Sequence, residues 1–196
     1  QEVGADMQRE FLDIIYRKAE LMTSILNELL DLARIEARRN KDFRYTRVDL
    51  QELLAELVKG YQLPSGRKAP ELDLPTDPLI LMADIGKLRQ ALLNVISNAY
   101  KYSPAGGDVT VEVAPGLAGE EGLVVIRVSD RGIGMSGEQA ERVFERFYRA
   151  DASGKIPGTG LGMSIVKEIV ELHGGSVSLS SQPGAGTTVS IFIPQA

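Results

Sequence analysis

The stretch Asn94-Val-Ile-Ser-Asn98-Ala-Tyr-Lys101-Tyr102 carries the strongest structural signal in this sequence. It lies at the end of a predicted helix that Asp84 caps and that runs to about Tyr102. Asn94, Asn98 and Lys101 are spaced by four and three residues, so they share one helical face. The pattern predicts a core helix whose polar strip lines a site, the plain alternative being a solvated face. The apolar residues that hold a different face to the core are Leu88, Ala91, Leu92, Val95 and Ala99.

Two amides above a lysine are suited to a phosphate group that carries its metal ion. An amide oxygen is a hard, neutral ligand of the kind that Mg²⁺ accepts, and Mg²⁺ commonly shares oxygens with a bound phosphate. Lys101 would offset the negative charge of that phosphate. The helix therefore predicts one part of a nucleotide site.

A second segment, Asp130-Arg-Gly132-Ile-Gly134, follows the strongly apolar run Leu123–Val128. A carboxylate at the end of a buried strand requires a hydrogen-bond donor, and the exocyclic amine of adenine is such a donor. Glycines here would remove side chains where a flat ring approaches the backbone. The alternative is an ordinary Asp-Arg-Gly turn.

A third segment, Gly158-Thr159-Gly160-Leu161-Gly162, opens a predicted helix. It is not the dinucleotide-binding fingerprint, because Met163 occupies the last glycine position, and it has no Gly-Lys-Ser/Thr of a P-loop. Free backbone N–H groups at a helix start favour anions, although an ordinary helix cap is the simpler alternative. Together the three segments supply the parts of an ATP site.

Bulk composition excludes several classes of protein. The 196 residues carry a net charge of -5 with a pI near 5.1, which argues against a nucleic-acid binder that relies on phosphate contacts. There is no cysteine, so disulfides and thiolate zinc sites are excluded. No apolar run approaches the roughly 20 residues that a membrane-spanning helix needs.

Residues 5–39 are predicted to form one long helix with a wide apolar stripe. Its length favours an oligomerisation helix over an ordinary packing helix. We expect this face to drive self-association, because apolar surface of that size rarely stays exposed. The stripe comprises Phe11, Ile14, Ile15, Leu21, Met22, Ile25, Leu26, Leu29, Leu32 and Ile35.

The remaining pattern is that of a mixed α and β domain beginning near residue 40. Asp49 is a predicted N-cap for a helix over 50–62, with Glu52 completing a capping-box pattern. Residues 135–157 show no period and are predicted to be a mobile connector. A helix is expected at about 160–172. Residues 40–48 are predicted to be a junction followed by a strand, and further strands are expected near 69–74, 78–83, 109–113, 123–128, 175–182 and 187–193.

The ordered segments resemble the catalytic core of the sensor histidine kinases of two-component signalling, in the ATPase superfamily shared with gyrase, heat-shock protein 90 and MutL. Residues 90–102 resemble the N box, 130–134 the first glycine box, 141–149 the F box and 158–162 the second glycine box. Residues 7–37 resemble the second helix of the dimerisation and phosphotransfer domain. The resemblance implies an α+β fold: a two-layer α/β sandwich of the Bergerat type, with a mixed sheet and helices on one face, preceded by a long N-terminal helix.

The resemblance also implies ATP and Mg²⁺ as ligands and assigns roles to residues. Asn98 would coordinate the metal ion, Asp130 would bind the adenine amine, and the span 135–157 would be a lid that Phe144 and Phe147 anchor to the core. The residues implied in catalysis are Asn94, Lys101 and Arg149. Those implied in nucleotide binding are Asn94, Asn98, Lys101, Tyr102, Asp130, Gly132, Gly134, Phe147, Gly158, Thr159, Gly160, Leu161 and Gly162.

The family's acceptor histidine has no counterpart in this sequence. The one histidine, His173, precedes Gly174-Gly175 at a family position read as structural, and a histidine near a helix C-terminus interacts favourably with the helix dipole. The resemblance thus implies a partial dimerisation domain over 1–40 and a catalytic domain over 41–196. We expect the chain to bind Mg·ATP without phosphorylating itself on histidine, and an acceptor helix supplied in trans is the expected route to phosphoryl transfer.

Asn94 separates this chain from the gyrase-like ATPases, which carry a glutamate there that activates water. An amide cannot accept a proton at neutral pH, so hydrolysis by general-base catalysis is not favoured. The alternatives are a gyrase-like or MutL-like ATPase and a non-catalytic nucleotide-binding, partner-switching module. The expected partners are a response regulator receiver domain, through the parent protein, and a second copy through helix 5–39. The expected location is the cytoplasm, with any membrane anchor upstream of Gln1.

Overall fold

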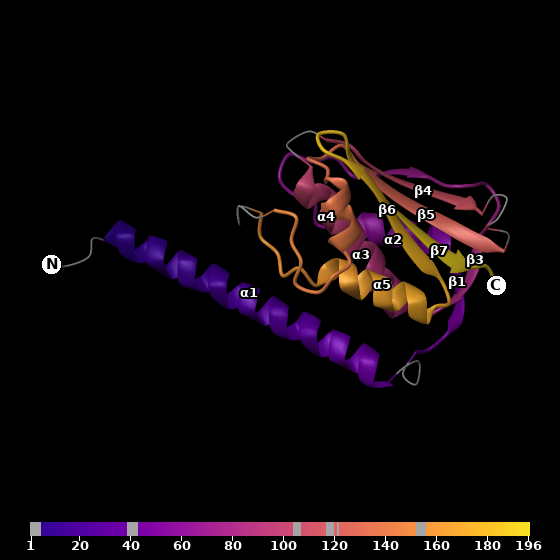
Figure 1. Ribbon diagram of the computed structural model, residues 1–196, viewed down its shortest axis with the longest axis horizontal. Helices are drawn as coiled ribbons and strands as arrows, with labels where there is room; N and C mark the ends of the chain where they lie inside the picture. Colours follow the sequence, from indigo (N-terminus) through magenta and orange to yellow (C-terminus); the bar gives the residue numbers. More distant parts are fainter. Residues whose placement is uncertain (1–4, 39–42, 104–106, 117–119, 121, 152–155) are drawn as a thin grey trace.

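The computed structural model describes residues 5–38, 43–103, 107–116, 120, 122–151 and 156–196. Helix α1 (Ala5–Arg38) is one continuous rod, and its N-terminal part extends well past the rest of the molecule (Figure 1). The remaining elements form a layered α/β body. The expected domain boundary near residue 40 lies outside the described residues. Among those residues, no helix is both long and apolar enough to cross a bilayer.

A five-stranded mixed sheet forms one layer of the body. Its order is β2-β4-β5-β7-β6, with β2 parallel to β4 and the other neighbours antiparallel. Alternation within β4 buries Val109, Val111 and Val113 and leaves the residues between them half-buried, so one face of the sheet is covered. The strands are β2 (Glu71–Asp73), β4 (Val109–Pro115), β5 (Leu123–Asp130), β6 (Ser176–Gln182) and β7 (Gly186–Pro194).

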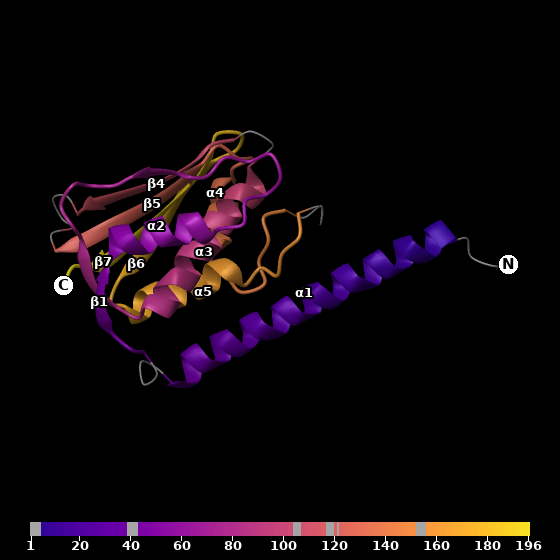
Figure 2. The ribbon, with the colours of Figure 1, turned by 180° about the vertical axis from the view of Figure 1, so that it is seen from behind.

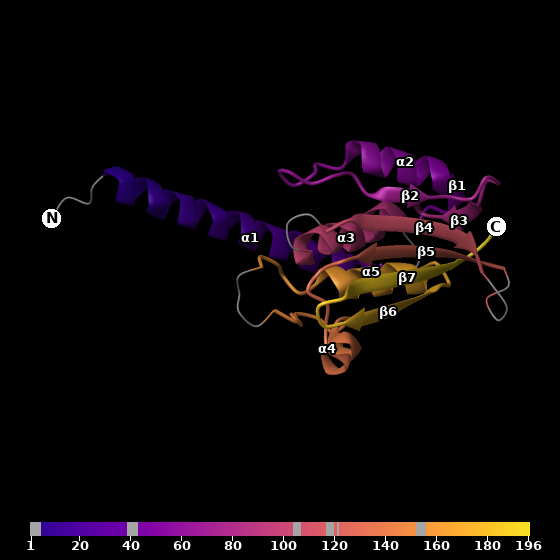
Figure 3. The same cartoon turned by 90° about the horizontal axis from the view of Figure 1, so that it is seen from above.

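Helices α3 (Ile85–Tyr102) and α5 (Gly162–Leu172) pack against each other and against this sheet (Figure 2). Both bury their apolar faces in one continuous core with β4, β5 and β7. Viewed from above, α2 (Leu50–Gly60) lies near β1 (Thr46–Asp49) and β3 (Ile80–Ala83), which form a separate two-stranded antiparallel sheet (Figure 3). The predicted two-layer fold with a mixed sheet is confirmed.

Two aspartates begin helices, as the sequence predicted. The Asp49 carboxylate accepts hydrogen bonds from the amides of Gln51 and Glu52, at 2.9 and 3.2 Å, and so caps α2. Asp84 accepts from the amide of Lys87 at 3.0 Å and caps α3. Side-chain caps of this kind satisfy amides that have no partner within the helix.

One short helix was missed by the sequence analysis. Helix α4 (Gly137–Arg142) lies in the span 135–157, which was expected to have no regular structure. Its six residues bury no side chain, so it leaves no apolar period to detect. The available signal was the capping box, in which Ser136 and Gln139 each bond to the other's backbone amide.

The apolar stripe of α1 is not uncovered along its whole length, contrary to expectation. Leu32 and Ile35 are each only 4% exposed and belong to the core of the body, while Leu29 packs against that core. The Asp31 carboxylate accepts a hydrogen bond of 2.9 Å from Gln90 of α3. The C-terminal half of α1 is therefore docked on the body, whereas Phe11 and its neighbours are exposed.

Candidate nucleotide-binding site

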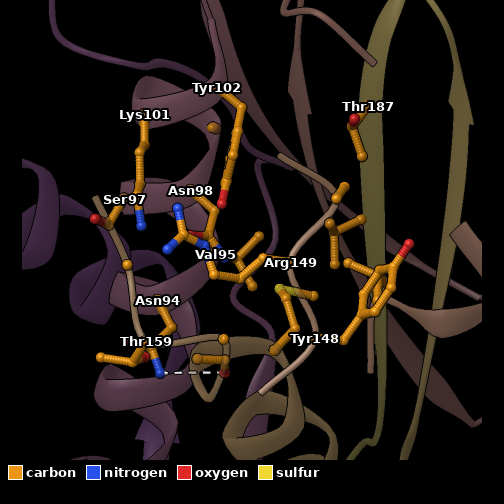
Figure 4. A pocket seen from close by; sticks show the side chains of 18 of the residues that line it. Asn94, Val95, Ser97, Asn98, Lys101, Tyr102, Tyr148, Arg149, Thr159 and Thr187 are labelled. Atoms are coloured by element: carbon orange, nitrogen blue, oxygen red, sulfur yellow. Dashed lines mark hydrogen bonds between the residues drawn. The ribbon is translucent and has the colours of Figure 1, made fainter. Parts of the chain in front are cut away.

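A cavity of about 390 Å³ opens between α3, the ends of β5 and β7, and the segment that leads into α5. Figure 4 shows the side chains of α3 on one side of it and those of Tyr148 and Thr187 on the other. All three segments that the sequence singled out contribute to its wall. The sequence-predicted residues in the lining are Asn94, Asn98, Lys101, Tyr102, Asp130, Gly134, Arg149, Gly158, Thr159, Gly160 and Gly162.

Helix α3 supplies the amide and lysine side of the cavity. Asn94, Asn98 and Lys101 all line it, as their shared helical face required (Figure 4). The Asn94 amide nitrogen lies 3.4 Å from the carbonyl oxygen of Gly162, which joins α3 to the start of α5. The packing of the apolar face of α3 in the core therefore fixes the direction in which this polar strip points.

Asp130 lies at the end of β5, half-buried in the cavity wall. Its Oδ1 accepts a hydrogen bond of 2.7 Å from the amide of Gly132. Burial raises the pKa of Asp130, and the backbone amides of Gly132 and Thr187 oppose that rise. A carboxylate that burial disfavours gains most from a further donor, such as the amine of a purine.

The two glycines after Asp130 are required by the close approach of other backbone segments. Gly134 has φ of +64°, and a Cβ there would collide with the carbonyl group of Gln182. A Cβ at Gly132 would lie 2.6 Å from the Asp130 carboxylate and would also strike the backbone of Tyr102. Gly134 lines the cavity, whereas Gly132 lies behind it and lets the turn close.

Two cationic side chains, Lys101 and Arg149, line the cavity near the glycine-rich segment: a Cβ at Gly158 would collide with the Lys101 Nζ. Burial, followed by the charge of Arg149, lowers the pKa of Lys101, while Glu28 of α1 opposes this shift. Arg149 Nη2 donates to the carbonyl oxygen of Ile156 at 2.5 Å. Its buried Nε has no hydrogen-bond partner among the residues that the structure describes. Half-buried cationic groups, one of them with a donor that has no partner within the described part of the chain, suit a phosphate group.

The glycine-rich segment runs along the cavity into the first turn of α5. Gly158, Thr159, Gly160 and Gly162 line the cavity, and Leu161 has no side-chain hydrogen bond that caps the helix. The first amides of α5 are thus not satisfied by a cap side chain, which is the condition for anion binding at a helix start. Leu161 itself is buried in the core, where it anchors the helix.

The two phenylalanines of the lid lie in different surroundings. Phe144 packs against the core, as the resemblance implied. Phe147 is 59% exposed, has φ of +63° and does not line the cavity, so its role as a lid anchor and nucleotide contact stays a prediction. Its backbone presses on Gly160, where a Cβ would lie 2.6 Å from the Phe147 carbonyl carbon.

Some lining residues carry no local sequence signal. Thr187 lines the cavity because the pairing of β5 with β7 places it opposite Asp130. Ser97 could have been found from its place beside the polar face of α3. Leu21, Ser24 and Glu28 come from α1, and only the docking of that helix brings them to the site.

His173 lies outside this cavity and has a structural environment. It is 7% exposed, its Nε2 accepts from the Asp84 amide at 3.0 Å, and its Nδ1 lies 2.8 Å from the Ile169 carbonyl oxygen. These two bonds fit a neutral ring with its proton on Nδ1. Burial lowers the pKa of His173, against opposing effects of Ile169 and Asp84. The rings of Phe43 and Tyr45 pack edge-on against it.

Comparison with known proteins identifies the family. The family described as histidine kinase-, DNA gyrase B-, and HSP90-like ATPase matches residues 83–196. The mycobacterial sensor histidine kinase MprB superposes with a TM-score of 0.64 at 30% identity, over 78% of this chain and 98% of that one. The chain belongs to the sensor histidine kinases.

Other relatives of this histidine kinase core extend over nearly the whole chain. Sensor histidine kinase WalK of Bacillus subtilis is 35% identical over 194 residues, covering 96% of this chain and 31% of WalK. SenX3 of Mycolicibacterium smegmatis, a sensor-like histidine kinase, is 36% identical, covering 97% of this chain and 49% of SenX3. Full-length ShkA in complex with AMPPNP gives a TM-score of 0.77 at 28% identity, over 100% of this chain and 40% of ShkA. The chain thus spans between about a third and a half of the length of WalK and SenX3.

The family match covers all three segments that build the cavity. Residues 83–196 include α3, the turn after β5 and the glycine-rich start of α5. The chain is therefore the ATP-binding catalytic core of a sensor histidine kinase. Helix α1 precedes the matched region and lies within the part that aligns with WalK and SenX3.

Proposed function

We propose that the cavity binds Mg·ATP with its adenine at Asp130 and its phosphates between α3 and the glycine-rich segment. The observation that carries this proposal is that one cavity brings together a strand-end carboxylate, two cationic side chains and a glycine-rich helix start. A half-buried carboxylate lies at the strand end, and Lys101 and Arg149 lie near the uncapped start of α5. A purine amine can donate a hydrogen bond to the carboxylate, and a triphosphate is an anion that the two cations can bind.

Mg²⁺ fits the donor set that the cavity offers. Asn94 and Asn98 present amide groups on the same face of α3, next to the end where the cations lie. Amide oxygens suit Mg²⁺, which would neutralise phosphate charge when bound. We assign Asn98 to the metal ion and Asn94 to the metal and phosphates.

Phosphoryl transfer would draw on positioning and charge. Lys101 and Arg149 would stabilise negative charge on the γ-phosphoryl group, and the amides of the glycine-rich segment would hold the other phosphates. Asn94 cannot remove a proton from water, so the site would preserve ATP for another nucleophile. That nucleophile would be a histidine imidazole: its nitrogen forms a bond to phosphorus, the bond to the bridging oxygen breaks, and ADP leaves.

The acceptor is not His173. Its side chain is buried away from the cavity and both ring nitrogens are engaged, with Asp84 and Ile169. We propose that the acceptor histidine is supplied by another segment or in trans. We further propose that residues 1–40 belong to a dimerisation domain and 41–196 to the catalytic domain, that a response regulator receives the phosphoryl group, and that the parent protein works in the cytoplasm.

Asp130→Asn tests the proposed function directly. Calorimetric titration with a non-hydrolysable ATP analogue, with and without Mg²⁺, should show binding to the wild-type chain that weakens by about 1.5–3 kcal/mol in the variant, because one charge-assisted hydrogen bond is lost. Asp77→Asn, which makes the same chemical change on an exposed loop, should bind as the wild type does. Equal affinity of wild type and Asp130→Asn would remove Asp130 from the base pocket.

A further inference from the structure

A carboxylate of α1 enters the nucleotide cavity. Glu28 lines the cavity, and its Oε2 accepts a hydrogen bond of 2.6 Å from the Thr159 hydroxyl in the glycine-rich segment. Its Oε1 accepts a bond of 2.8 Å from Ser24, one turn earlier on α1. Both oxygens are therefore held, so the carboxylate has a defined place at the wall of the site.

Glu28 contacts or faces the same residues that we propose bind the phosphates of ATP. Burial lowers the pKa of Lys101, and the negative charge of Glu28 partly opposes that lowering, so the two groups interact electrostatically. Thr159 belongs to the glycine-rich segment that leads into α5, and Arg149, which also lines the cavity, acts electrostatically on Lys101. Asp130, the other carboxylate in the cavity wall, belongs to the proposed adenine end.

We propose that Glu28 takes the place of an anionic phosphate oxygen, so that α1 in this docked position competes with a nucleoside triphosphate. The inference rests on the proposed function and adds a regulatory contact to it. A triphosphate that reaches the glycine-rich segment meets a carboxylate on the same hydroxyl and beside the same lysine. Two anions cannot share those partners without repulsion, so triphosphate binding displaces Glu28 from Thr159.

The proposal makes the site sensitive to the number of phosphates. Adenosine contacts the Asp130 end alone, so its affinity does not depend on Glu28. ADP brings its phosphates nearer to the carboxylate, and ATP brings them nearest. Docked α1 therefore discriminates most strongly against the triphosphate.

Glu28→Gln removes the charge, keeps the shape and retains one acceptor oxygen for the Thr159 hydroxyl. Calorimetric titration with adenosine, ADP and a non-hydrolysable ATP analogue, each with Mg²⁺, should show triphosphate affinity increased by about 5- to 20-fold in the variant, the range of an ordinary coupling between sites. ADP should gain less, and adenosine should change by less than about twofold. Glu10→Gln is the matched control, since it makes the same change at an exposed position of the same helix, about 27 Å away along its axis.

The outcomes separate the inference from the function on which it rests. If neither wild type nor variant binds any adenine nucleotide, the proposed function fails. If wild type binds the triphosphate and Glu28→Gln binds it equally well, the competition is refuted. Weaker Mg-dependent binding by Glu28→Gln would make the carboxylate a metal ligand and would also overturn the proposal. Circular dichroism melting of each variant shows that the folded state is retained.

Linkage supplies a second measurement, because a ligand that competes with helix docking must loosen that docking. The chain has no cysteine, so Asn27→Cys on α1 and Ser180→Cys on β6, both exposed, accept a pair of spin labels. Saturating triphosphate analogue should lengthen or broaden the label distance in the otherwise wild-type chain, and adenosine should leave it unchanged. An identical distribution with triphosphate bound would contradict displacement of α1.

Discussion

The two halves of α1 share one apolar period but differ in what covers them. In the C-terminal half, Leu32 and Ile35 are buried in the core of the catalytic body. In the N-terminal half, Phe11 and Leu12 are 53% and 65% exposed, and the N-terminal part of α1 extends past the described body (Figures 1 and 2). Amphipathic spacing in the sequence predicts that one face of a helix is buried. It does not predict whether that face packs on the same chain or on a second copy.

The docked half also shows that one helix can serve two surfaces. Leu32 and Ile35 face the body, whereas Met22, Leu26 and Leu30 of the same region remain exposed. The wide apolar stripe predicted from the sequence therefore divides into two. An inner stripe, which includes Leu32 and Ile35, packs on the body. An outer stripe, which includes Met22, Leu26 and Leu30, is exposed and continues into the N-terminal half. The outer stripe is the surface on which we expect a second copy to pack.

The largest effect is expected where the two halves differ most in burial. Leu32→Ala should lower the free energy of α1 docking by about 2–5 kcal/mol, because it leaves a cavity in the core. Leu12→Ala, the matched change in the exposed half, should stay within about 0.5 kcal/mol. Hydrogen exchange of the amides in α1, together with chemical unfolding, measures both. A similar loss of docking free energy in Leu32→Ala and Leu12→Ala would show that the two halves of α1 do not differ in how they pack on the body.

A smaller effect is expected on self-association through the exposed half. Phe11→Ser removes a side chain whose full burial contributes about 1.5–3 kcal/mol, so it should weaken dimerisation by at least about tenfold. Sedimentation equilibrium over micromolar concentrations measures the change. A wild-type chain that stays strictly monomeric at tens of micromolar would refute the expected association.

The smallest effect at neutral pH is expected at the joint between α1 and the body, where Phe43 and Tyr45 pack on His173. Burial lowers the pKa of His173 below its ordinary value of 6.5, so the unfolded state binds the proton more readily than the folded state. Stability should be complete above about pH 6.5 and should fall as the pH drops from there towards the folded-state pKa.

His173→Gln provides the control for this pH dependence. The variant should be less stable at neutral pH, and it should lack the part of the pH slope that His173 contributes. Denaturant midpoints at several pH values between 5 and 8 give the comparison. Asp84 and Tyr45 are the ionisable groups nearest the ring, and their ordinary pKa values lie outside this interval. Equal slopes in both chains would exclude His173 as the titrating group.

Much of the fold follows from local sequence because the responsible interactions are local. Asp49 and Asp84 cap helices through amides two and three residues away, and the alternation in Val109–Val113 places β4. Helix α4 escaped prediction because it buries nothing. The exposure of Phe147 goes with a left-handed backbone, which is not expected at a phenylalanine from its sequence neighbours.

The site was predictable wherever its residues lie on one element. Asn94, Asn98 and Lys101 follow from helical geometry alone. Thr187 required the register of β5 with β7, and Glu28 required the docking of α1, which are long-range relations. The sequence shows that α1 is amphipathic, but the packing of Leu32 and Ile35 decides which of its polar residues reaches the cavity.

Asp84 mechanically couples the region after α1 to the amide-bearing helix α3. One carboxylate oxygen receives the amide of Lys87 in the first turn of α3, the other receives the amide of Arg44 at 2.9 Å, and the Asp84 amide itself bonds to His173. If the segment at Arg44 moves, either the hydrogen bond between the Arg44 amide and the Asp84 carboxylate breaks or the start of α3 moves with it. The same helix carries Asn98 and Lys101 towards its far end, so Asp84 joins the segment after α1 to the helix that lines the nucleotide cavity.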